Sequence, residues 1–287
     1  MQRQFVPKTV LQIIQDEKIT AAMMVPTMIN FLLNVPELDS YDLNSLKWIM
    51  VGGAPMSPAN AARMMEKLGC QYISGYGLTE TTPLLTVGNL KDTLANADEA
   101  EKMNYITRTG LEVPGVDLRV VDSSGNDVPQ DGITVGEIIV RGDNVMKGYW
   151  KLPDATAEAI RDGYFHTGDL ATVDAQGYVL IVDRAKDIII SGGENISSVE
   201  IENVIYRHPD VLECAVIAFS DEKWGEVPAA LVVLKANVQL SEQELKEFCQ
   251  ERLAKFKIPK QIHFVSELPK TGSGKILKAQ LRRHYRK

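Results

Sequence analysis

The segment 182–202, VDRAKDIIISGGENISSVEIE, gathers charge and glycine in a single bend. A strand-like run leads into the charged residues Asp183, Arg184, Lys186 and Asp187, and the pair Gly192-Gly193 follows. Glycine lets a backbone approach a ligand closely, and bend residues at a domain boundary absorb large dihedral changes. Taken alone, these residues favour an ordinary β-turn with solvated charges. Further along the chain, other segments favour a boundary between two domains that move against each other.

The segment YGLTET, 76–81, places a glycine, hydroxyl groups and a carboxylate where a predicted strand ends. Backbone amides in such a turn can hold a phosphate, and Glu80 is able to bind a hard cation such as Mg²⁺. The alternative is a loop in which Glu80 is solvated. Six residues alone do not decide between these interpretations.

The segment YFHTGDL, 164–170, presents Asp169 directly after a glycine. A carboxylate in this position can accept both hydroxyls of a ribose, as acidic residues do at dinucleotide sites. The alternative is a tight turn in which the Asp169 side chain bonds the nearby backbone. His166 has no acid or nucleophile partner evident from the sequence, so we predict a structural role for it.

The segment PKTGSGKI, 269–276, resembles a phosphate-binding loop but fails as a Walker motif. Pro269 stands where that motif has its first glycine, and Ile276 follows Lys275 in place of Ser or Thr. We interpret the segment as a flexible loop that delivers Lys275 to an anion. A solvated loop lysine is the alternative.

Composition excludes several classes of protein. The chain of 287 residues is 45% hydrophobic and 24% charged, as in a soluble globular protein, and its net charge of −7 argues against nucleic-acid binding. No apolar run approaches the roughly 18 residues of a membrane span. The three cysteines are odd in number and far apart, which suggests neither a zinc site nor a disulfide framework. We therefore expect a cytoplasmic protein without a nucleophilic cysteine.

The first part of the chain follows the pattern of a parallel α/β sheet. Strands are predicted at 21–25 and 46–51, and a helix begins at Ser57-Pro58 and is closed by Gly69. In such sheets ligands bind at the carboxyl ends of the strands, where Gly52-Gly53 and the run 74–77 fall.

From about residue 116 the pattern changes. The runs DLRVVD, EIIVRG and YVLIVD are short predicted strands of an antiparallel or barrel-like section, 110–183. After the charged bend, helices and strands alternate, and Ser241 with Glu244 forms a predicted capping box. The fold class is therefore α/β with α+β, in two domains, 1–183 and 184–287.

Six segments, in this order, resemble those of the acyl- and aryl-CoA synthetases of the adenylate-forming superfamily. They are GGAPMSP, YISGYGLTETTP, GEIIVRGDNVMKGYW, GYFHTGDL, DRAKDIIISGGENISSVEIE and PKTGSGKI. The resemblance covers the chain from about Val10 onward. It implies an enzyme that activates a carboxylic acid with ATP and Mg²⁺ to an acyl-adenylate, then transfers the acyl group to the thiol of coenzyme A.

The resemblance also implies roles for individual residues. The residues that would line the adenine and acyl side of the pocket are Gly53, Ala54, Ser74, Gly75 and Tyr76. Thr79 would contact the adenylate phosphate, and Glu80 the magnesium. Asp169 would hold the ribose hydroxyls beside Arg184, and Lys275 would bridge the α-phosphate and the substrate carboxylate.

The C-terminal domain would act as a mobile lid. The resemblance places the hinge at Lys186. In one pose the lid would bring Lys275 to the adenylate; in the other, Gly192-Gly193 would face the pantetheine of coenzyme A, with Lys223 and Trp224 near its nucleotide end.

One feature of the family is not found in the sequence. The Ser/Thr/Gly-rich phosphate loop should lie well upstream of GGAP, and no such stretch precedes Gly52. Because family members are nearly twice this length, we expect the C-terminal half of such an enzyme, the remainder of its large domain plus the lid, impaired in adenylation. A non-catalytic nucleotide- or coenzyme A-binding module, or one half of a split enzyme, is the alternative. A homo-oligomer or a separate N-terminal half as partner chain remains open.

Overall fold

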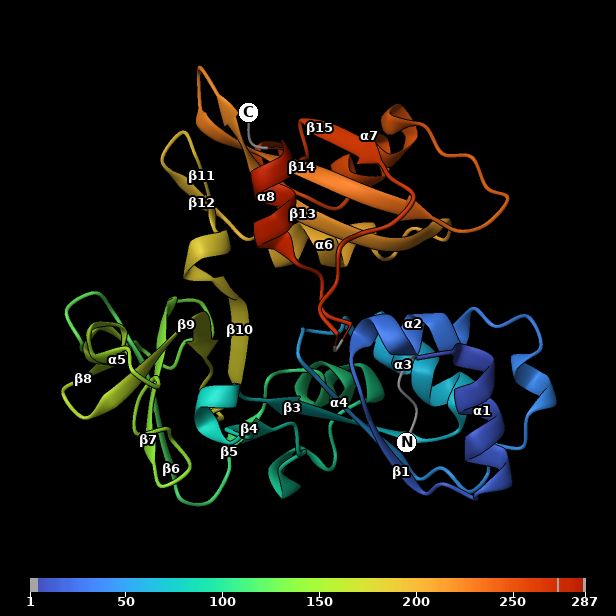
Figure 1. Ribbon diagram of the computed structural model, residues 1–287, viewed down its shortest axis with the longest axis horizontal. Helices are drawn as coiled ribbons and strands as arrows, with labels where there is room; N and C mark the ends of the chain where they lie inside the picture. Colours follow the sequence, from blue (N-terminus) through green and yellow to red (C-terminus); the bar gives the residue numbers. More distant parts are fainter. Residues whose placement is uncertain (1–4, 273, 286–287) are drawn as a thin grey trace. The chain divides into compact units, whose positions relative to one another are not determined.

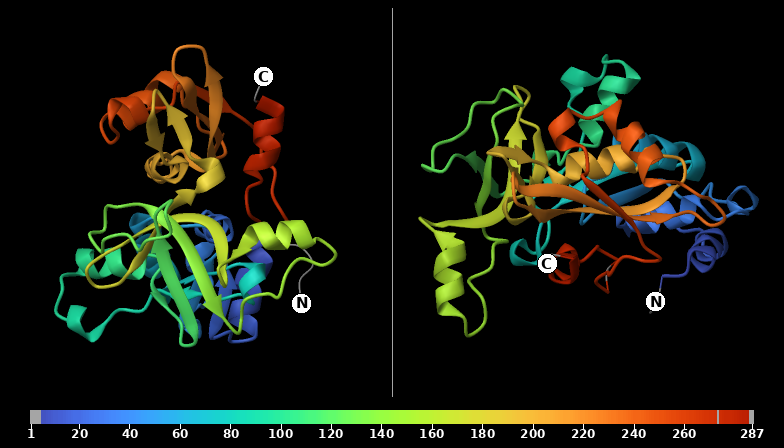
Figure 2. Two further views of the ribbon diagram at one scale, coloured as in Figure 1. Left: turned by 90° about the vertical axis from the view of Figure 1, so that its left-hand side faces the viewer. Right: turned by 90° about the horizontal axis from the view of Figure 1, so that it is seen from above.

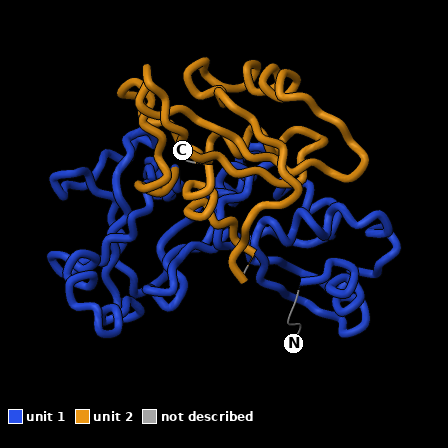
Figure 3. Tube along the Cα trace, turned by 45° about the horizontal axis from the view of Figure 1, so that its top comes forward, with its two compact units in different colours: residues 1–182 blue, residues 183–287 orange. Residues whose placement is uncertain are grey.

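The computed structural model describes residues 5–272 and 274–285, which form a mixed α/β fold (Figure 1 and Figure 2). The chain divides into two compact units, residues 1–182 and residues 183–287 (Figure 3). Each unit has its own sheets and its own buried apolar clusters.

Unit 1 begins with a parallel sheet flanked by helices. Its first sheet has the order β1-β2-β3-β4-β5, in which β1 to β3 run parallel and β4 and β5 antiparallel. The strands are β1 (Ala21–Met24), β2 (Trp48–Gly52), β3 (Gln71–Tyr76), β4 (Thr86–Val87) and β5 (Leu111–Glu112). The helices are α1 (Pro7–Asp16), α2 (Pro26–Leu33), α3 (Pro58–Leu68) and α4 (Glu99–Ile106).

Helix α3 begins and ends where the sequence predicts. Ser57 accepts a hydrogen bond from Asn60 N at 3.3 Å, Pro58 occupies the first turn, and Gly69 adopts φ 64° just past the end. Serine, proline and glycine at these positions satisfy the free backbone groups at the start of the helix and allow the left-handed residue at its end.

The second sheet of unit 1 has the strand order β10-β9-β7-β6, with β8 paired to β9, and the pairs β6–β7, β7–β9 and β8–β9 are antiparallel. Its strands are β6 (Val116–Val121), β7 (Gly136–Gly142), β8 (Ile160–Arg161), β9 (Tyr164–Val173) and β10 (Val179–Arg184), and α5 (Pro153–Ala159) precedes β8. The three predicted strands of this section are present. The longest strand, β9, was not predicted, because its sequence carries a glycine and an aspartate in the middle.

Unit 2 is built on the long hairpin of β13 (Val211–Asp221) and β14 (Gly225–Leu234). Its sheet has the order β12-β11-β14-β13, with β15 parallel to β14. The other strands are β11 (Ile189–Ser191), β12 (Glu194–Ile196) and β15 (Gln261–Phe264), and the helices are α6 (Ser198–Ile205), α7 (Glu242–Gln250) and α8 (Lys278–Tyr285).

Both faces of the β13–β14 hairpin are buried. Alternate residues of β13 such as Cys214 and Val216 pack with Ile201 of α6 and Leu245 of α7. The residues that alternate with them, such as Ile217, pack in a second cluster with Leu281 of α8. Because side chains alternate across a strand, a near-continuous apolar run is required here, and Cys214 is in the core as predicted.

The outer edge of β13 is covered by a side chain of α6 and by that of Tyr206, the residue directly after the helix. Glu202 Oε1 accepts a hydrogen bond from Val216 N at 2.7 Å, and Tyr206 Oη donates to Cys214 O at 3.2 Å. Covering unpaired backbone groups in this way protects an edge strand from pairing with another chain. Among the described residues, no helix combines the length and apolar character that crossing a bilayer requires.

The predicted capping box of α7 is present and provides a test of local stability. Ser241 Oγ accepts from Glu244 N at 3.2 Å, while Ser241 N donates to Glu244 Oε2 at 2.8 Å. We expect Ser241→Ala to lower the free energy of unfolding of unit 2 by about 1 kcal/mol. Hydrogen exchange of the β13 and β14 amides at increasing urea measures this change.

The matched control is Ser266→Ala, because Ser266 is exposed and the structure shows no side-chain hydrogen bond for it among the described residues. A loss of equal size in both variants would contradict the capping role.

Candidate functional site

The ends of β2 and β3 bring two predicted ligand-binding segments side by side. Gly52 pairs with Gly75 in the parallel register, so the exposed residues Gly53 and Ala54 leave the sheet beside Tyr76. A Cβ on Gly52 would lie 2.8 Å from Gly75 O, which explains the glycine there. Ser74 is buried one residue earlier on β3. This is the carboxyl edge at which parallel sheets bind ligands.

The loop after β3 is held in one shape by buried polar contacts. A Cβ on Gly77 would lie 1.6 Å from Pro83 O, so no other residue fits. The fully buried Thr81 accepts a hydrogen bond from Leu78 N at 3.0 Å. Asn144 Nδ2 donates to the carbonyl oxygens of Thr81 and Leu84 at 2.9 and 3.1 Å. The short 3-10 helix 79–81, which carries Thr79 and Glu80, is therefore fixed on both sides.

Glu80 is held by the segment that follows β7. Tyr149 Oη donates to Glu80 Oε1 at 3.0 Å, and Met146 N donates to Glu80 O at 2.7 Å. Burial, together with the Glu80 carboxylate, raises the pKa of Tyr149, so the phenol keeps the proton that it donates. The Glu80 side chain is thus oriented by a neutral partner.

The chemistry of Glu80 is compatible with the magnesium ion that the sequence predicts. The described residues contain no group of three His, Cys, Asp or Glu side chains that would hold a metal by themselves. Magnesium in nucleotide sites is bound by one or two carboxylates, and phosphate oxygens and water complete its shell. A single oriented carboxylate satisfies this requirement.

Asp169 is presented by a bulge in β9. Between the pairs Glu137↔Leu170 and Ile139↔His166, three residues of β9 face one residue of β7. Gly168 adopts φ 70° inside the bulge, and Thr167 Oγ1 donates to Ile138 O at 2.8 Å. Bulges of this kind redirect a side chain. The glycine that suggests a turn in the sequence therefore lies within a continuous strand.

The bulge places Asp169 against Tyr76, 93 residues earlier in the sequence. Tyr76 Oη donates to Asp169 Oδ2 at 2.8 Å, and Asp169 is only 4% exposed. This bond joins the carboxyl edge of the parallel sheet to the antiparallel sheet. Two segments that were singled out independently in the sequence thus form one cluster.

Glu137 supports the bulge and gives His166 a partner. Glu137 Oε1 accepts from Gly168 N at 3.0 Å, and Oε2 lies 2.8 Å from His166 Nδ1. His166, for which the sequence shows no acid partner, therefore has one in Glu137. The partner comes from the neighbouring strand, which the linear sequence does not reveal. The contact is consistent with a structural role, because the same carboxylate holds the loop.

In unit 2, Gly192, the first residue of the glycine pair after β11, packs against Trp224. A Cβ on Gly192, which has φ 60°, would lie 2.7 Å from Trp224 Cε3, and Gly192 N donates to Trp224 O at 2.8 Å. Lys223 Nζ lies 4.8 Å from the centroid of the Trp224 ring. Gly192, Gly193, Lys223 and Trp224 are therefore neighbours, and a half-exposed aromatic ring beside an ammonium forms their surface.

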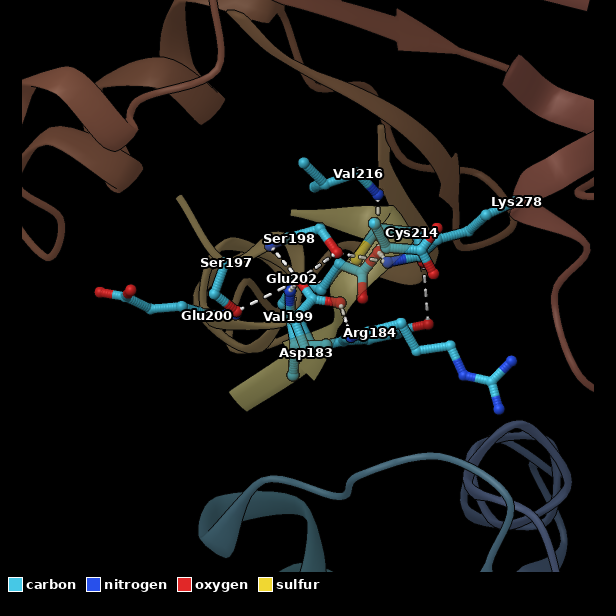
Figure 4. Close-up of polar contacts among 12 residues, drawn as sticks. Asp183, Arg184, Ser197, Ser198, Val199, Glu200, Glu202, Cys214, Val216 and Lys278 are labelled. Carbon is cyan, nitrogen blue, oxygen red and sulfur yellow. Dashed lines mark hydrogen bonds and ion pairs between the residues drawn. The ribbon is translucent and has the colours of Figure 1, made fainter. Parts of the chain in front are cut away.

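The bend at the start of unit 2 has a buried and an exposed side. The carboxylate of Asp183, 2% exposed, accepts hydrogen bonds from Ser198 N at 2.6 Å and Ser198 Oγ at 2.7 Å (Figure 4). It thus stabilises the first turn of α6, where the helix dipole favours a negative charge. Arg184 and Lys186 are exposed on the other side. Their roles stay predictions.

Lys275 is exposed in the loop between β15 and α8. Thr271 N donates to Lys275 O at 2.8 Å, and Lys275 N donates to Thr271 Oγ1 at 3.1 Å, so the loop closes on itself. Ser273 of the PKTGSGKI segment lies outside the described residues. The predicted site residues thus fall into two sets, one in each unit, and the structure establishes the neighbours of each set within its own unit.

Three supporting residues were missed in the sequence: Glu137, Asn144 and Tyr149. All three lie in the segment GEIIVRGDNVMKGYW, 136–150. This segment is one of the six that carry the family resemblance, but no role was predicted for its polar side chains.

Comparison with known proteins gives consistent matches. Residues 1–150 match the family model described as AMP-binding enzyme, and residues 200–275 match the one described as AMP-binding enzyme C-terminal domain. A feruloyl-CoA synthase of Amycolatopsis sp. is 44% identical over 281 residues, covering 98% of this chain and 55% of that protein. The chain spans about half the length of the curated relatives it matches.

Solved structures agree with the sequence matches. The anthranilate CoA ligase AuaEII, in complex with anthranoyl-AMP, superposes with a TM-score of 0.87 at 30% identity, covering 98% of this chain and 52% of that one. The amide bond synthetase McbA from Marinactinospora thermotolerans gives 0.85 at 31% identity, covering 98% and 56%.

The reactivity of the three cysteines can be tested, because burial is expected to keep their thiols unreactive. Burial raises the pKa of Cys70 and of Cys249 to about 11, and raises the pKa of Cys214 well above its usual range. Because the thiolate is the nucleophile, these thiols stay protonated and unreactive at pH 8. We expect no reaction of the folded chain with a disulfide reagent at pH 8, and reaction of three thiols after unfolding.

A Ser266→Cys variant, which adds an exposed thiol, is the positive control. Modification of a native cysteine in the folded chain at the rate of the added thiol would overturn this interpretation.

Proposed function

The chain belongs to the AMP-binding enzyme family, and from this membership we propose that it carries the adenylate- and coenzyme A-handling part of an AMP-forming acid–CoA ligase. The observation that carries the proposal is the hydrogen bond between Tyr76 and Asp169, which unites the YGLTE and TGD segments at one sheet edge. The names of the relatives support it, because they include a feruloyl-CoA synthase and a benzoate–CoA ligase.

The reaction has two steps. In the first, a carboxylate oxygen of the acid attacks the α-phosphorus of ATP, the bond to the β-phosphate breaks, and pyrophosphate leaves. In the second, the thiol of coenzyme A attacks the acyl carbon, loses its proton, and AMP leaves as the acyl–oxygen bond breaks. The acid is proposed to be an aromatic or short aliphatic carboxylic acid.

Each residue of unit 1 has a proposed part in holding the nucleotide. Asp169 accepts the ribose hydroxyls, and its bond to Tyr76 fixes the direction of the carboxylate. Gly53, Ala54 and the segment 74–76 line the adenine and acyl side. Thr79 donates to the adenylate phosphate, from a loop that Thr81 and Asn144 hold in place.

Glu80 is the proposed magnesium ligand. The ion, when bound, neutralises phosphate charge. The Glu80 carboxylate is oriented for this by Tyr149, whose phenol occupies one of its oxygens.

Unit 2 is the proposed mobile lid. Unit 1 then corresponds to the remainder of a large domain with a barrel-like section at about 110–183, and Lys186 is the hinge. Lys275 supplies positive charge to the α-phosphate and carboxylate during adenylation, and Arg184 lies beside the ribose. Coenzyme A is received by Gly192, Gly193, Lys223 and Trp224. The glycines leave the backbone open to close approach, and the Trp224 ring and the Lys223 ammonium lie beside them.

Acyl transfer measured on this chain tests the proposal. We expect the chain to convert a supplied acyl-adenylate and coenzyme A to acyl-CoA and AMP, detected by thioester absorbance after chromatography. Lys275→Ala should spare this step, because the lysine acts on the first reaction. In a protein that also contains the phosphate loop, the same change should slow adenylation by about 10²–10³-fold.

The same chain should show no exchange between ATP and pyrophosphate, since the sequence contains no Ser/Thr/Gly-rich phosphate loop. Exchange at an ordinary rate would contradict this part of the proposal. Binding of AMP and coenzyme A without transfer would favour a non-catalytic module or one half of a split enzyme. Equal loss of both steps in Lys275→Ala would contradict the division of labour within the lid.

A further inference from the structure

The loop that carries Lys275 has a narrow stem. Lys270 and Ile276 form an antiparallel bridge, and Leu277 N donates to Pro269 O at 2.8 Å. The exposed Lys275 lies one residue beyond this bridge, and α8 begins at Lys278. The position of Lys275 within unit 2 is therefore set by whatever holds the two sides of the stem.

The entry side of the stem is held by a buried carboxylate of β13. Lys270 Nζ lies 2.7 Å from Glu213 Oε2, and the two side chains are 24% and 3% exposed. Glu213 Oε1 has no hydrogen-bond partner among the described residues. Loss of the Lys270 ammonium would leave a buried carboxylate poorly compensated, which is strongly unfavourable.

The exit side is held by a second carboxylate, from α6. Lys278 Nζ lies 2.7 Å from Glu202 Oε1 and donates to Ser198 Oγ at 2.7 Å (Figure 4). The side chains of Lys278 and Glu202 are 17% and 14% exposed. Ser198 in turn donates to Asp183, the first residue of unit 2. The exit side is thus tied to the start of the unit.

The charge of Lys278 persists through the neutral pH range. Burial of the ammonium lowers the pKa of Lys278, but attraction to Glu202 and Asp183 outweighs it, and the net shift is upward. Burial raises the pKa of the Glu202 carboxyl, so the ion pair weakens as the pH falls toward that raised pKa as well as when it rises above the ordinary lysine range.

We propose that Lys270 and Lys278 are positioning residues that fix the loop carrying Lys275, each through an ion pair with a largely buried carboxylate on a different element, Glu213 of β13 and Glu202 of α6. The inference rests on the role proposed for Lys275. A lysine on a loop anchored on both sides loses less conformational freedom when it meets an anion than one on a loose loop.

Hydrogen exchange on this chain tests the anchoring directly. In Lys270→Met and Lys278→Met we expect the amides of Thr271, Lys275 and Leu277 to exchange about tenfold faster, because local opening no longer breaks an ion pair. Amides of the β13–β14 hairpin should be accelerated much less than those of the loop. Lys270→Arg and Lys278→Arg, which retain the charge, should restore protection of the loop.

Lys255→Met is the matched control, since Lys255 is exposed on unit 2 and the structure shows no ion pair for it among the described residues. Glu213→Gln is the milder second variant, with the same expected result at the same amides. The proposal is overturned if the loop amides exchange at wild-type rates in all anchor variants. It is also overturned if loop and hairpin amides are accelerated equally in Glu213→Gln and in both Met variants.

The outcome separates this inference from the proposed function. Loop exchange reports the anchors whether or not the chain transfers an acyl group. Faster loop exchange with no acyl transfer would support the anchors and count against the function. Normal acyl transfer with unchanged loop exchange would support the function and count against the anchors. Transfer should survive in Lys270→Met, because Lys275 acts in the other step, whereas a general loss of structure would reduce it.

Discussion

The central physical constraint in unit 1 is the burial of the Asp169 carboxylate. A carboxylate that is 4% exposed is tolerated only where polar groups compensate for lost water. Tyr76 supplies one such group from the parallel sheet, and the bulge of β9 turns the side chain toward it. The bulge itself depends on Glu137, which accepts the Gly168 amide. This edge of the parallel sheet is therefore a polar network that only the correct pairing of two sheets can produce.

In unit 2, buried charged groups are likewise compensated by specific partners, here mainly through ion pairs. Its hairpin is apolar on both faces, so the few charged groups near it are held by specific partners. Asp183 stabilises the start of α6, and Glu202 serves both the edge of β13 and Lys278. Asp187 pairs with Arg282 of α8. The bend at the start of the unit and the helix at its end are thus connected through buried charge.

The sequence was sufficient for features that depend on neighbouring residues. The start and end of α3 are set by serine, proline and glycine, and the start of α7 by its capping box. These residues act on backbone groups only a few positions away, so the residue types alone indicate the local conformation. The sequence was insufficient where partners are far apart. Tyr76 and Asp169 are separated by 93 residues, and Tyr149 and Glu80 by 69. In the sequence, the glycine in TGD is as compatible with a turn as with a bulge. The pairing register of β9 with β7 shows that it lies in a bulge. Six motifs in order nevertheless identified the family, because order carries information that no single motif has.

The most direct test of the account is whether Asp169 recognises the ribose diol. Calorimetric titration of this chain with AMP and with 2′,3′-dideoxy-AMP measures the contribution of the hydroxyls. We predict that the wild-type chain binds AMP at least about tenfold more tightly than 2′,3′-dideoxy-AMP, as expected for hydrogen bonds to a charged group. Asp169→Asn should lose most of this preference. Equal affinity of the wild-type chain for the two nucleotides would contradict the account.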